Sequence, residues 1–460
     1  MSRRVLAGRL PALTDRFPAL AVRDFRLLLA DRLLAPAAFA FSLVGVAFAV
    51  LDTTGSTADL SYVLAAQVAP VLVFTLIGGV MADRQPPQRV IIAGNLMIAL
   101  GEGSFGGLVL LGHPRLWQMI ALEAVTGTGV AMFYPASQAL LPRVVPGGLL
   151  TQASALSRLA MNAGQMGGAA VAGLVVAATG PGWALAVCGL GMLGTVPVLS
   201  RLRARPAPRP EHEPGIVREL RDGWAEFRSR TWLWTITAQY SIVVMAWYGG
   251  FQVLGPVVAR AHLGGPASWG AIAAVESVGL IVGGLVALRF TPRRPMLFVV
   301  VVGAVIGLPV LALAMLWPLP LICVVAFAEG IAVEAMMVQW TVALATRVPP
   351  GVQARVSAYD AFGSLLATPA GMLAAGPLAV AIGVPATLYG AVVLIVAATA
   401  VALVPRSIRS TRSGEGLALS DASAGDGQRE SVVAATGRPA AAATPGELRR
   451  ARLRPGDDLV

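Results

Sequence analysis

Seven carboxylate residues interrupt the apolar stretches of this sequence. They are Asp31, Glu102, Glu123, Glu276, Glu329, Glu334 and Asp360. On insertion scales a charge at the centre of a bilayer costs about 2.5 to 3.5 kcal/mol, so an acid kept inside a membrane span is a functional candidate by default. A carboxyl group that is neutral in one state and charged in another supplies the chemistry of proton coupling. These acids are therefore our candidates for proton coupling, substrate contact or gating.

The elements that must position these acids are membrane-spanning helices. Only 13% of the 460 residues are charged and the mean hydropathy is +0.73, whereas soluble domains carry about 25% charged residues. The apolar stretches lack the alternation of outer-membrane barrels, so helices must satisfy the backbone in lipid. We expect an all-α polytopic membrane protein with about twelve helices in two sets of six. The windows lie near 28–51, 60–81, 90–112, 117–139, 155–178 and 182–200, then 232–256, 266–288, 296–317, 319–344, 357–379 and 384–404.

The basic and sulfur-containing residues exclude several chemistries. All 35 basic residues are Arg, and the formal net charge is +11. A P-loop and a Schiff base both need a Lys, so neither can form. The two cysteines and three histidines are too scattered for a disulfide framework or a metal site. They are Cys188, Cys323, His113, His212 and His262. We expect no enzyme activity, no cofactor, no metal and no nucleic-acid partner.

The placement of arginine predicts the orientation of the chain. Twenty-two arginines fall in the N-terminal tail, the central loop and alternate loops, whereas the intervening loops hold only Arg115 and Arg260. Because arginine is enriched in cytoplasmic loops, both termini are expected in the cytoplasm. The predicted organisation is a cytoplasmic tail (1–26), a six-helix half (27–200), a cytoplasmic loop (201–231), a second half (232–404) and a disordered cytoplasmic tail (405–460).

A repeated segment supports two related halves. GGVMADRQPPQR at 78–89 and GGLVALRFTPRR at 283–294 share six of twelve residues, and RVVP at 143–146 matches RVPP at 347–350. Parallel repeats of this kind build transporters whose halves rock about a central site.

GGVMADRQPPQRV resembles the loop 2–3 signature of the major facilitator superfamily, G-x3-D-R-x-G-R-R. Gly79, Asp83 and Arg84 match it and Arg89 remains, although Pro86 replaces the usual small or acidic residue. FYPASQALLPRVVP at 133–146 and FRLLLADRLL near the first helix are similar to the bacterial drug and siderophore exporter branch, which includes enterobactin and macrolide exporters. The resemblance covers about residues 25 to 404.

The resemblance implies a conformational latch at Gly79, Asp83, Arg84 and Arg89. Asp83 would accept backbone N–H groups at the start of helix 11 and hold the cytoplasmic side closed. An ordinary solvated loop charge is the alternative. The second copy has Leu288 where the acid should be, so such a latch would act on one side only.

The resemblance also ranks the buried acids. Helices 1, 4, 7 and 10 line the cavity in this superfamily, which favours Glu123, Glu329 and Glu334 as proton-coupling or substrate residues. Tyr240 and Trp247 share a face of helix 7 and could form an aromatic wall, or else face lipid. The remaining residues form a second tier. Glu102 and Glu276 should hydrogen-bond a neighbouring helix, Asp360 should be a helix-end group, Asp31 and Arg32 should snorkel or form a gate pair, and Arg158 should be an interfacial charge.

The segment NAGQMGGAAVAG at 162–173 resembles a degenerate exporter motif, with Gly168 where a Pro would stand; close helix packing is the alternative.

The resulting hypothesis is a monomeric, proton-driven exporter of a small organic molecule, a drug or natural product, in the bacterial cytoplasmic (inner) membrane. A proton-coupled importer and a receptor-like member that has lost transport are the alternatives. The sequence does not identify the substrate.

Overall fold

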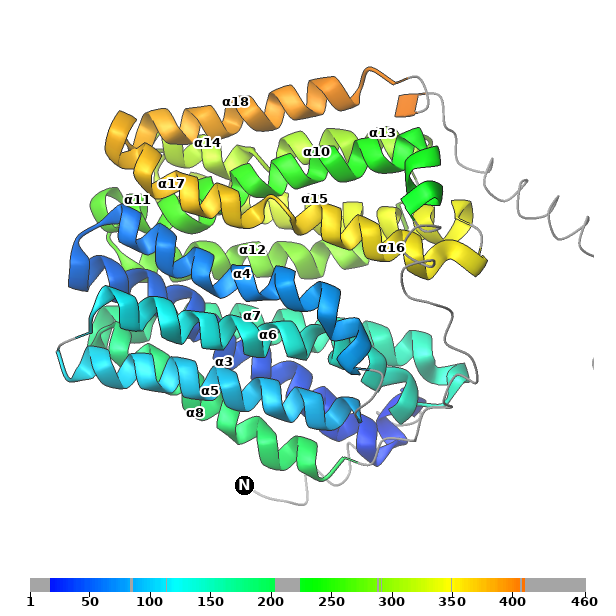
Figure 1. Ribbon diagram of the computed structural model, residues 1–460, viewed down its shortest axis with the longest axis horizontal. Coiled ribbons are helices and arrows are strands. Elements are labelled where there is room, and N and C mark those ends of the chain that lie inside the picture. Colours follow the sequence, from blue (N-terminus) through cyan, green and yellow to red (C-terminus); the bar gives the residue numbers. More distant parts are fainter. Residues whose placement is uncertain are drawn as a thin grey trace, which may run out of the picture.

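The computed structural model describes residues 17–82, 86–112, 114–202, 224–287, 289–290, 292–348, 350–405 and 408–409 (Figure 1). Asp83, Arg84 and Leu288 of the repeated signature lie outside the described residues, as do most of both predicted tails and of the central loop. The surroundings of Gly79 are not described either.

Eighteen elements follow one another in the described residues, and every one of them is helical. The first group is η1 (Pro18–Ala21), α3 (Arg23–Thr54), α4 (Thr57–Ala82), α5 (Pro87–Leu110), α6 (Leu116–Val144), η2 (Gly147–Leu149), α7 (Leu150–Thr179) and α8 (Pro181–Ser200). The second group is α10 (Thr231–Trp247), the π-helix η3 (Tyr248–Val253), α11 (Leu254–His262), α12 (Pro266–Ala287), α13 (Pro295–Val305), α14 (Leu308–Ala314), α15 (Leu319–Arg347), α16 (Pro350–Leu365), α17 (Thr368–Ile382) and α18 (Val384–Ala402).

The lengths of these helices agree with membrane spans. Within the described residues, eleven helices are long and apolar enough to cross a membrane, and α4 adds the shorter apolar stretch Thr57–Val73. α10, η3 and α11 together form one span, Thr231–His262. The predicted class, an all-α polytopic membrane protein, is confirmed.

The helices form two groups that pack side by side (Figure 1). In the N-terminal group, α3 packs on α7 and α8, and α5 packs on α6 and α8. In the C-terminal group, α12 packs on α15, and α10 packs on α13, α16 and α18. The two most extensive contacts between the groups are α7 against α12 and α4 against α17, and smaller ones join α3 to α11 and α12, and α4 to η3 and α16.

The Gly-rich segment of α7 provides close helix packing. A Cβ atom at Gly164 would lie 2.2 Å from the carbonyl oxygen of Leu33, and one at Gly168 would lie 2.3 Å from that of Ala37. Both distances are too short for any side chain, so the two glycines allow α7 to approach the backbone of α3. Gly173 and Gly270 bring α7 against α12 in the same way, because a Cβ at Gly173 would lie 2.9 Å from Gly270 Cα.

The ends of the bundle differ in charge. Arg89 lies in the first turn of α5, Arg143 and Arg347 lie in the last turns of α6 and α15, and Arg230 directly precedes α10; we call this end of the bundle the Arg-rich end. Arg260 lies in the last turn of α11, at the opposite end. At the Arg-rich end, Gln88 Nε2 donates a hydrogen bond of 2.7 Å to the Leu199 carbonyl oxygen, joining the start of α5 to the end of α8. Arg89 itself is exposed.

Candidate functional site

A cavity of about 560 Å³ lies between the two groups of helices. The N-terminal group contributes side chains that include Phe39, Gln67 and Phe133, and the C-terminal group contributes Trp247 and Glu276 among others. The volume is within the range of pockets that bind small organic molecules. Glu276 is the only acid among its lining residues, and the described lining contains no Arg or His.

One face of α12 carries the acid into the cavity. Trp269, Ala273 and Glu276 all line it, at spacings of four and three residues that place them on one helical face. Within the described residues Glu276 has no hydrogen bond and no ion pair, so the expectation of a hydrogen bond to a neighbouring helix is not met. Helix α12 packs on α15 through glycines, and a Cβ at Gly279 would lie 2.3 Å from the Phe327 carbonyl oxygen. A Cβ at Gly330 of α15 would lie 2.4 Å from the Glu276 carbonyl oxygen, so Glu276 lies beside the α12–α15 seam as well as in the cavity wall.

Four aromatic rings form a continuous surface beside this acid. Trp247 stacks on Phe251 with 5.2 Å between ring centroids, and Phe251 contacts Trp269 at 5.0 Å. Tyr248 meets Trp247 edge-on at 5.0 Å. All four rings line the cavity. The π-helix η3 explains the arrangement, since its wider turn displaces the following residues around the helix axis.

Glu329 lies behind the aromatic surface. It is 2% exposed, its Oε2 atom is buried without a hydrogen-bond partner, and the buried Nε1 atom of Trp247 also has none. The two side chains are close enough to interact electrostatically without hydrogen-bond geometry. No described residue of α15 lines the cavity, so Glu329 and Glu334 are outside its wall.

Two further acids lie within the N-terminal group. Gln67, which lines the cavity, donates a hydrogen bond of 2.8 Å from Nε2 to Glu123 Oε2. Ser42 donates one of 2.5 Å to Glu102 Oε1, which agrees with the expected bond to a neighbouring helix. Each acid keeps one buried oxygen without a hydrogen bond. Glu123 therefore reaches the cavity only through Gln67.

Asp31 and Arg32 are buried, which rules out snorkelling, whereas the alternative of a gate pair stays a prediction. Arg32 is 5% exposed and donates a hydrogen bond of 2.6 Å from Nη2 to the Ser137 carbonyl oxygen on α6. Its Nη1 atom lies 3.8 Å from Met161 Sδ on α7. The prediction overlooked that α6 and α7 both cover this part of α3, so the guanidinium is held inside the N-terminal group.

Asp360 is not a helix-end group, because α16 begins ten residues earlier at Pro350. Its carboxylate is buried and accepts two hydrogen bonds, 2.6 Å from Thr237 Oγ1 and 2.8 Å from Trp340 Nε1. Asp360 thus joins α16 to α10 and α15 through these hydrogen bonds.

Tyr240 packs in an apolar cluster of the C-terminal group and does not line the cavity.

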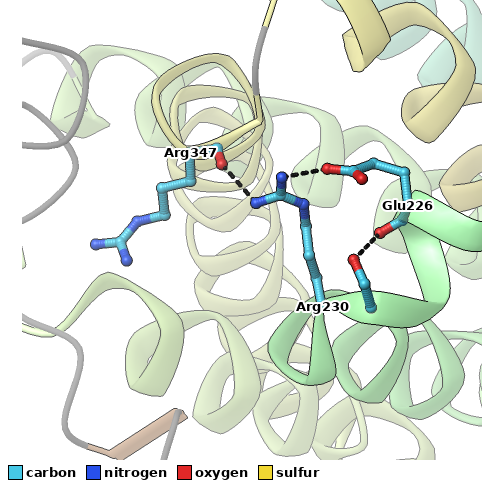
Figure 2. Close-up of polar contacts among 4 residues, drawn as sticks. Glu226, Arg230 and Arg347 are labelled. Carbon is cyan, nitrogen blue, oxygen red and sulfur yellow. Dashed lines mark hydrogen bonds and ion pairs between the residues drawn. The ribbon is translucent and has the colours of Figure 1, made fainter. Parts of the chain in front are cut away.

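A polar junction closes the Arg-rich end of the C-terminal group (Figure 2). Arg230 Nη1 donates a hydrogen bond of 3.0 Å to the carbonyl oxygen of Arg347, the last residue of α15, and Nη2 pairs with Glu226. A cation at a helix C-terminus is favoured by the helix dipole. The short helical segment 224–229 is thereby held against α15.

Sequence reasoning missed Gln67, Phe251 and Trp269 as lining residues and placed Glu276 in the second tier. The spacing of Trp269, Ala273 and Glu276 was an available signal. Which face of α12 meets the cavity, however, depends on its packing against α7 and α15.

A family model described as Major Facilitator Superfamily matches residues 33–317. The chain belongs to the Major Facilitator Superfamily. It is 26% identical over 373 residues to the "Multidrug efflux pump Tap" of Mycolicibacterium fortuitum, covering 78% of this chain and 90% of that protein. It is 26% identical over 289 residues to the "Enterobactin exporter EntS" of Escherichia coli O1:K1, covering 61% and 67%.

Solved structures of this superfamily share the fold. A bacterial homologue of the human lysosomal transporter Spinster, in an inward-facing and unoccupied conformation, has a TM-score of 0.66 at 18% identity and covers 85% of this chain and 99% of that chain. A mutant form of the nucleoside transporter NupG has a TM-score of 0.70 at 10% identity and covers 83% and 99%. Its membership of the Major Facilitator Superfamily and its exporter relatives make this chain a multi-pass membrane transporter of small molecules and not an enzyme.

Proposed function

We propose that the protein is a secondary active exporter that exchanges protons for a small organic molecule by alternating access. The observation that carries the proposal is the cavity between the two groups, with Glu276 in its wall and Glu329 directly behind its aromatic surface. Acids inside a membrane span are typical of proton relays in transporters. The names of two relatives, a multidrug efflux pump and an enterobactin exporter, support the outward direction.

In this proposal Glu276 and Glu329 are the primary proton-coupling candidates, and Glu123 acts on the cavity through Gln67. Neutralising a buried acid removes the cost of an unpaired charge, so protonation and cargo binding can stabilise different states of the two groups. Glu334 is reassigned to a contact between the groups, because it pairs with Arg158. The latch expected at Asp83 remains part of the proposal, with the Arg-rich end on the cytoplasmic side of the inner membrane and a monomer as the working unit.

The experiment that tests the proposal uses everted membrane vesicles with a respiration-driven pH gradient. Addition of an exported compound should collapse part of the gradient in vesicles that contain the protein, and control vesicles without it should not respond. A panel of lipophilic drugs and natural products is needed because the cargo is unidentified. If whole cells instead take up the compound only when the external medium is more acidic than the cytoplasm, the protein is a proton-coupled importer. No response in either assay would contradict transport.

A further inference from the structure

We propose that the cavity recognises a lipophilic cation, with Glu276 as the counter-ion and the rings of Trp247, Tyr248, Phe251 and Trp269 as the surface for its apolar body. The inference rests on the proposed function, whose cargo it specifies by chemical class. Glu276 is the one acid among the lining residues, and the described lining offers neither Arg nor His to balance it.

The charge of Glu276 has no partner in the described part of the protein. Its carboxylate makes no hydrogen bond or ion pair there, and the groups that act on it electrostatically are Glu329 from α15 and Tyr248 from η3. Neither is a cation. A carboxylate in an apolar site is costly unless it is paired or protonated. A cationic cargo supplies the missing partner, and a proton is its competitor for the same group.

The geometry of α12 sets the size of the cargo. Trp269 and Glu276 are seven residues apart on one face of the helix, which corresponds to roughly 10 Å along its axis. A molecule with a cationic centre at Glu276 and an aromatic or aliphatic body of about this length contacts both. Ala273 lies between them on the same face and leaves room for the body.

The aromatic surface suits a cation in a second way. Ring faces carry negative partial charge, and quaternary ammonium groups are recognised by aromatic side chains in many proteins. The amide groups of Gln67 and Gln252 complete the wall with neutral hydrogen-bonding groups. The cavity thus combines an acid, aromatic rings and amides, which favours a cation over a neutral molecule and disfavours an anion.

The test is binding of two probes of similar shape to the full-length protein in lipid nanodiscs. Tetraphenylphosphonium is permanently cationic, and triphenylphosphine oxide is neutral. The wild-type protein should bind the cation more tightly. Glu276→Gln should weaken cation binding about thirtyfold or more, the loss expected when a buried charge pair is broken, and should change binding of the neutral oxide less than about twofold.

Two variants keep the result interpretable. Glu276→Asp retains the charge and should retain most of the preference for the cation. Glu226→Gln removes an acid outside the cavity and should leave both affinities unchanged, which controls for net charge. Size-exclusion profiles of all variants establish that they fold. A wild-type protein that binds the cation no more tightly than the oxide, or a Glu276→Gln variant that keeps the preference, would overturn the inference.

The failure of this inference and of the proposed function are separable, because the binding assay needs no proton gradient. Proton-coupled export of a neutral or anionic compound would retain the proposed function and overturn the cationic cargo. Cation binding through Glu276 without proton exchange in vesicles would retain the cationic cargo and overturn proton-coupled export.

Discussion

Arg158 on α7 and Glu334 on α15 form an ion pair across the interface between the two groups of helices, with 3.1 Å between Nη1 and Oε1. The residues are 176 positions apart in the chain. A second pair, Arg260 on α11 and Asp52 on α3, also joins the groups, with 3.1 Å between Nη2 and Oδ1. Both cross the interface at which an alternating-access transporter must open and close.

Breaking the first pair should favour separation of α7 from α15. Arg158→Gln or Glu334→Gln is expected to change the ratio between the conformations in which α7 and α15 are together and apart by about fivefold or less. Exposed ion pairs contribute about 0.2 to 1 kcal/mol, and the Arg158 side chain is 64% exposed. Single-molecule fluorescence between labels at the Arg-rich ends of α7 and α15 measures the shift. The charge swap Arg158→Glu with Glu334→Arg should restore the wild-type distribution; a swap that behaves like the single variants would argue against the pair.

Breaking the second pair should shift the same equilibrium in the opposite direction. Asp52 and Arg260 lie at the end of the bundle away from the Arg-rich end, where their pairing holds α3 against α11. Asp52→Asn should therefore increase accessibility at that end, measured by the labelling rate of a cysteine introduced at the half-buried Thr57. Raising the salt concentration should reduce the difference in labelling rate between Asp52→Asn and the wild type, because screening weakens this exposed pair. Identical labelling of variant and wild type would contradict this role.

Asp360 should be a stability residue more than a transport residue. Replacement by Ala leaves the Thr237 hydroxyl and the Trp340 indole N–H without their acceptor, so the free energy of unfolding should fall by about 2 to 4 kcal/mol. Denaturant unfolding in detergent provides the measurement. Combining Asp360→Ala with Trp340→Phe should cost less than the sum of the single changes, because the two side chains share one hydrogen bond. Strict additivity would show that the bond contributes nothing.

The glycines of α7 allow a comparison between neighbouring positions. Gly168→Ala places a Cβ 2.3 Å from the Ala37 carbonyl oxygen, whereas Gly167→Ala meets nothing within 4 Å. Overpacking costs about 1 to 3 kcal/mol, so Gly168→Ala should lower thermal stability and folded yield. Gly167→Ala should be neutral or slightly stabilising, because Ala is the better helix former. Equal stability of the two variants would show that α7 and α3 do not approach this closely.

The sequence predicted the helices well and the site only in part. A long apolar window is a local feature of the sequence, and each of the twelve predicted windows overlaps a described helix, eleven of which are long and apolar enough to span a membrane. The start of α16 was missed because Pro350 begins the helix within a polar segment. Glu276 was placed in the second tier of candidate site residues, and Arg158 was not predicted to pair with Glu334. The position of Glu276 in the cavity wall and the Arg158–Glu334 pair both depend on how helices distant in the chain are rotated against one another.

Proton coupling at the cavity acids is the central claim, and proton flux measured in proteoliposomes tests it most directly. An outward gradient of an exported compound, with a pH-sensitive dye inside the vesicles, should drive proton movement opposite to the compound in the wild-type protein. Glu276→Gln or Glu329→Gln should abolish the proton flux in at least one case, while the compound still moves down its own gradient. Full proton coupling in both variants would contradict the assignment of these acids, and compound movement by the wild type without any proton flux would contradict proton-coupled export itself.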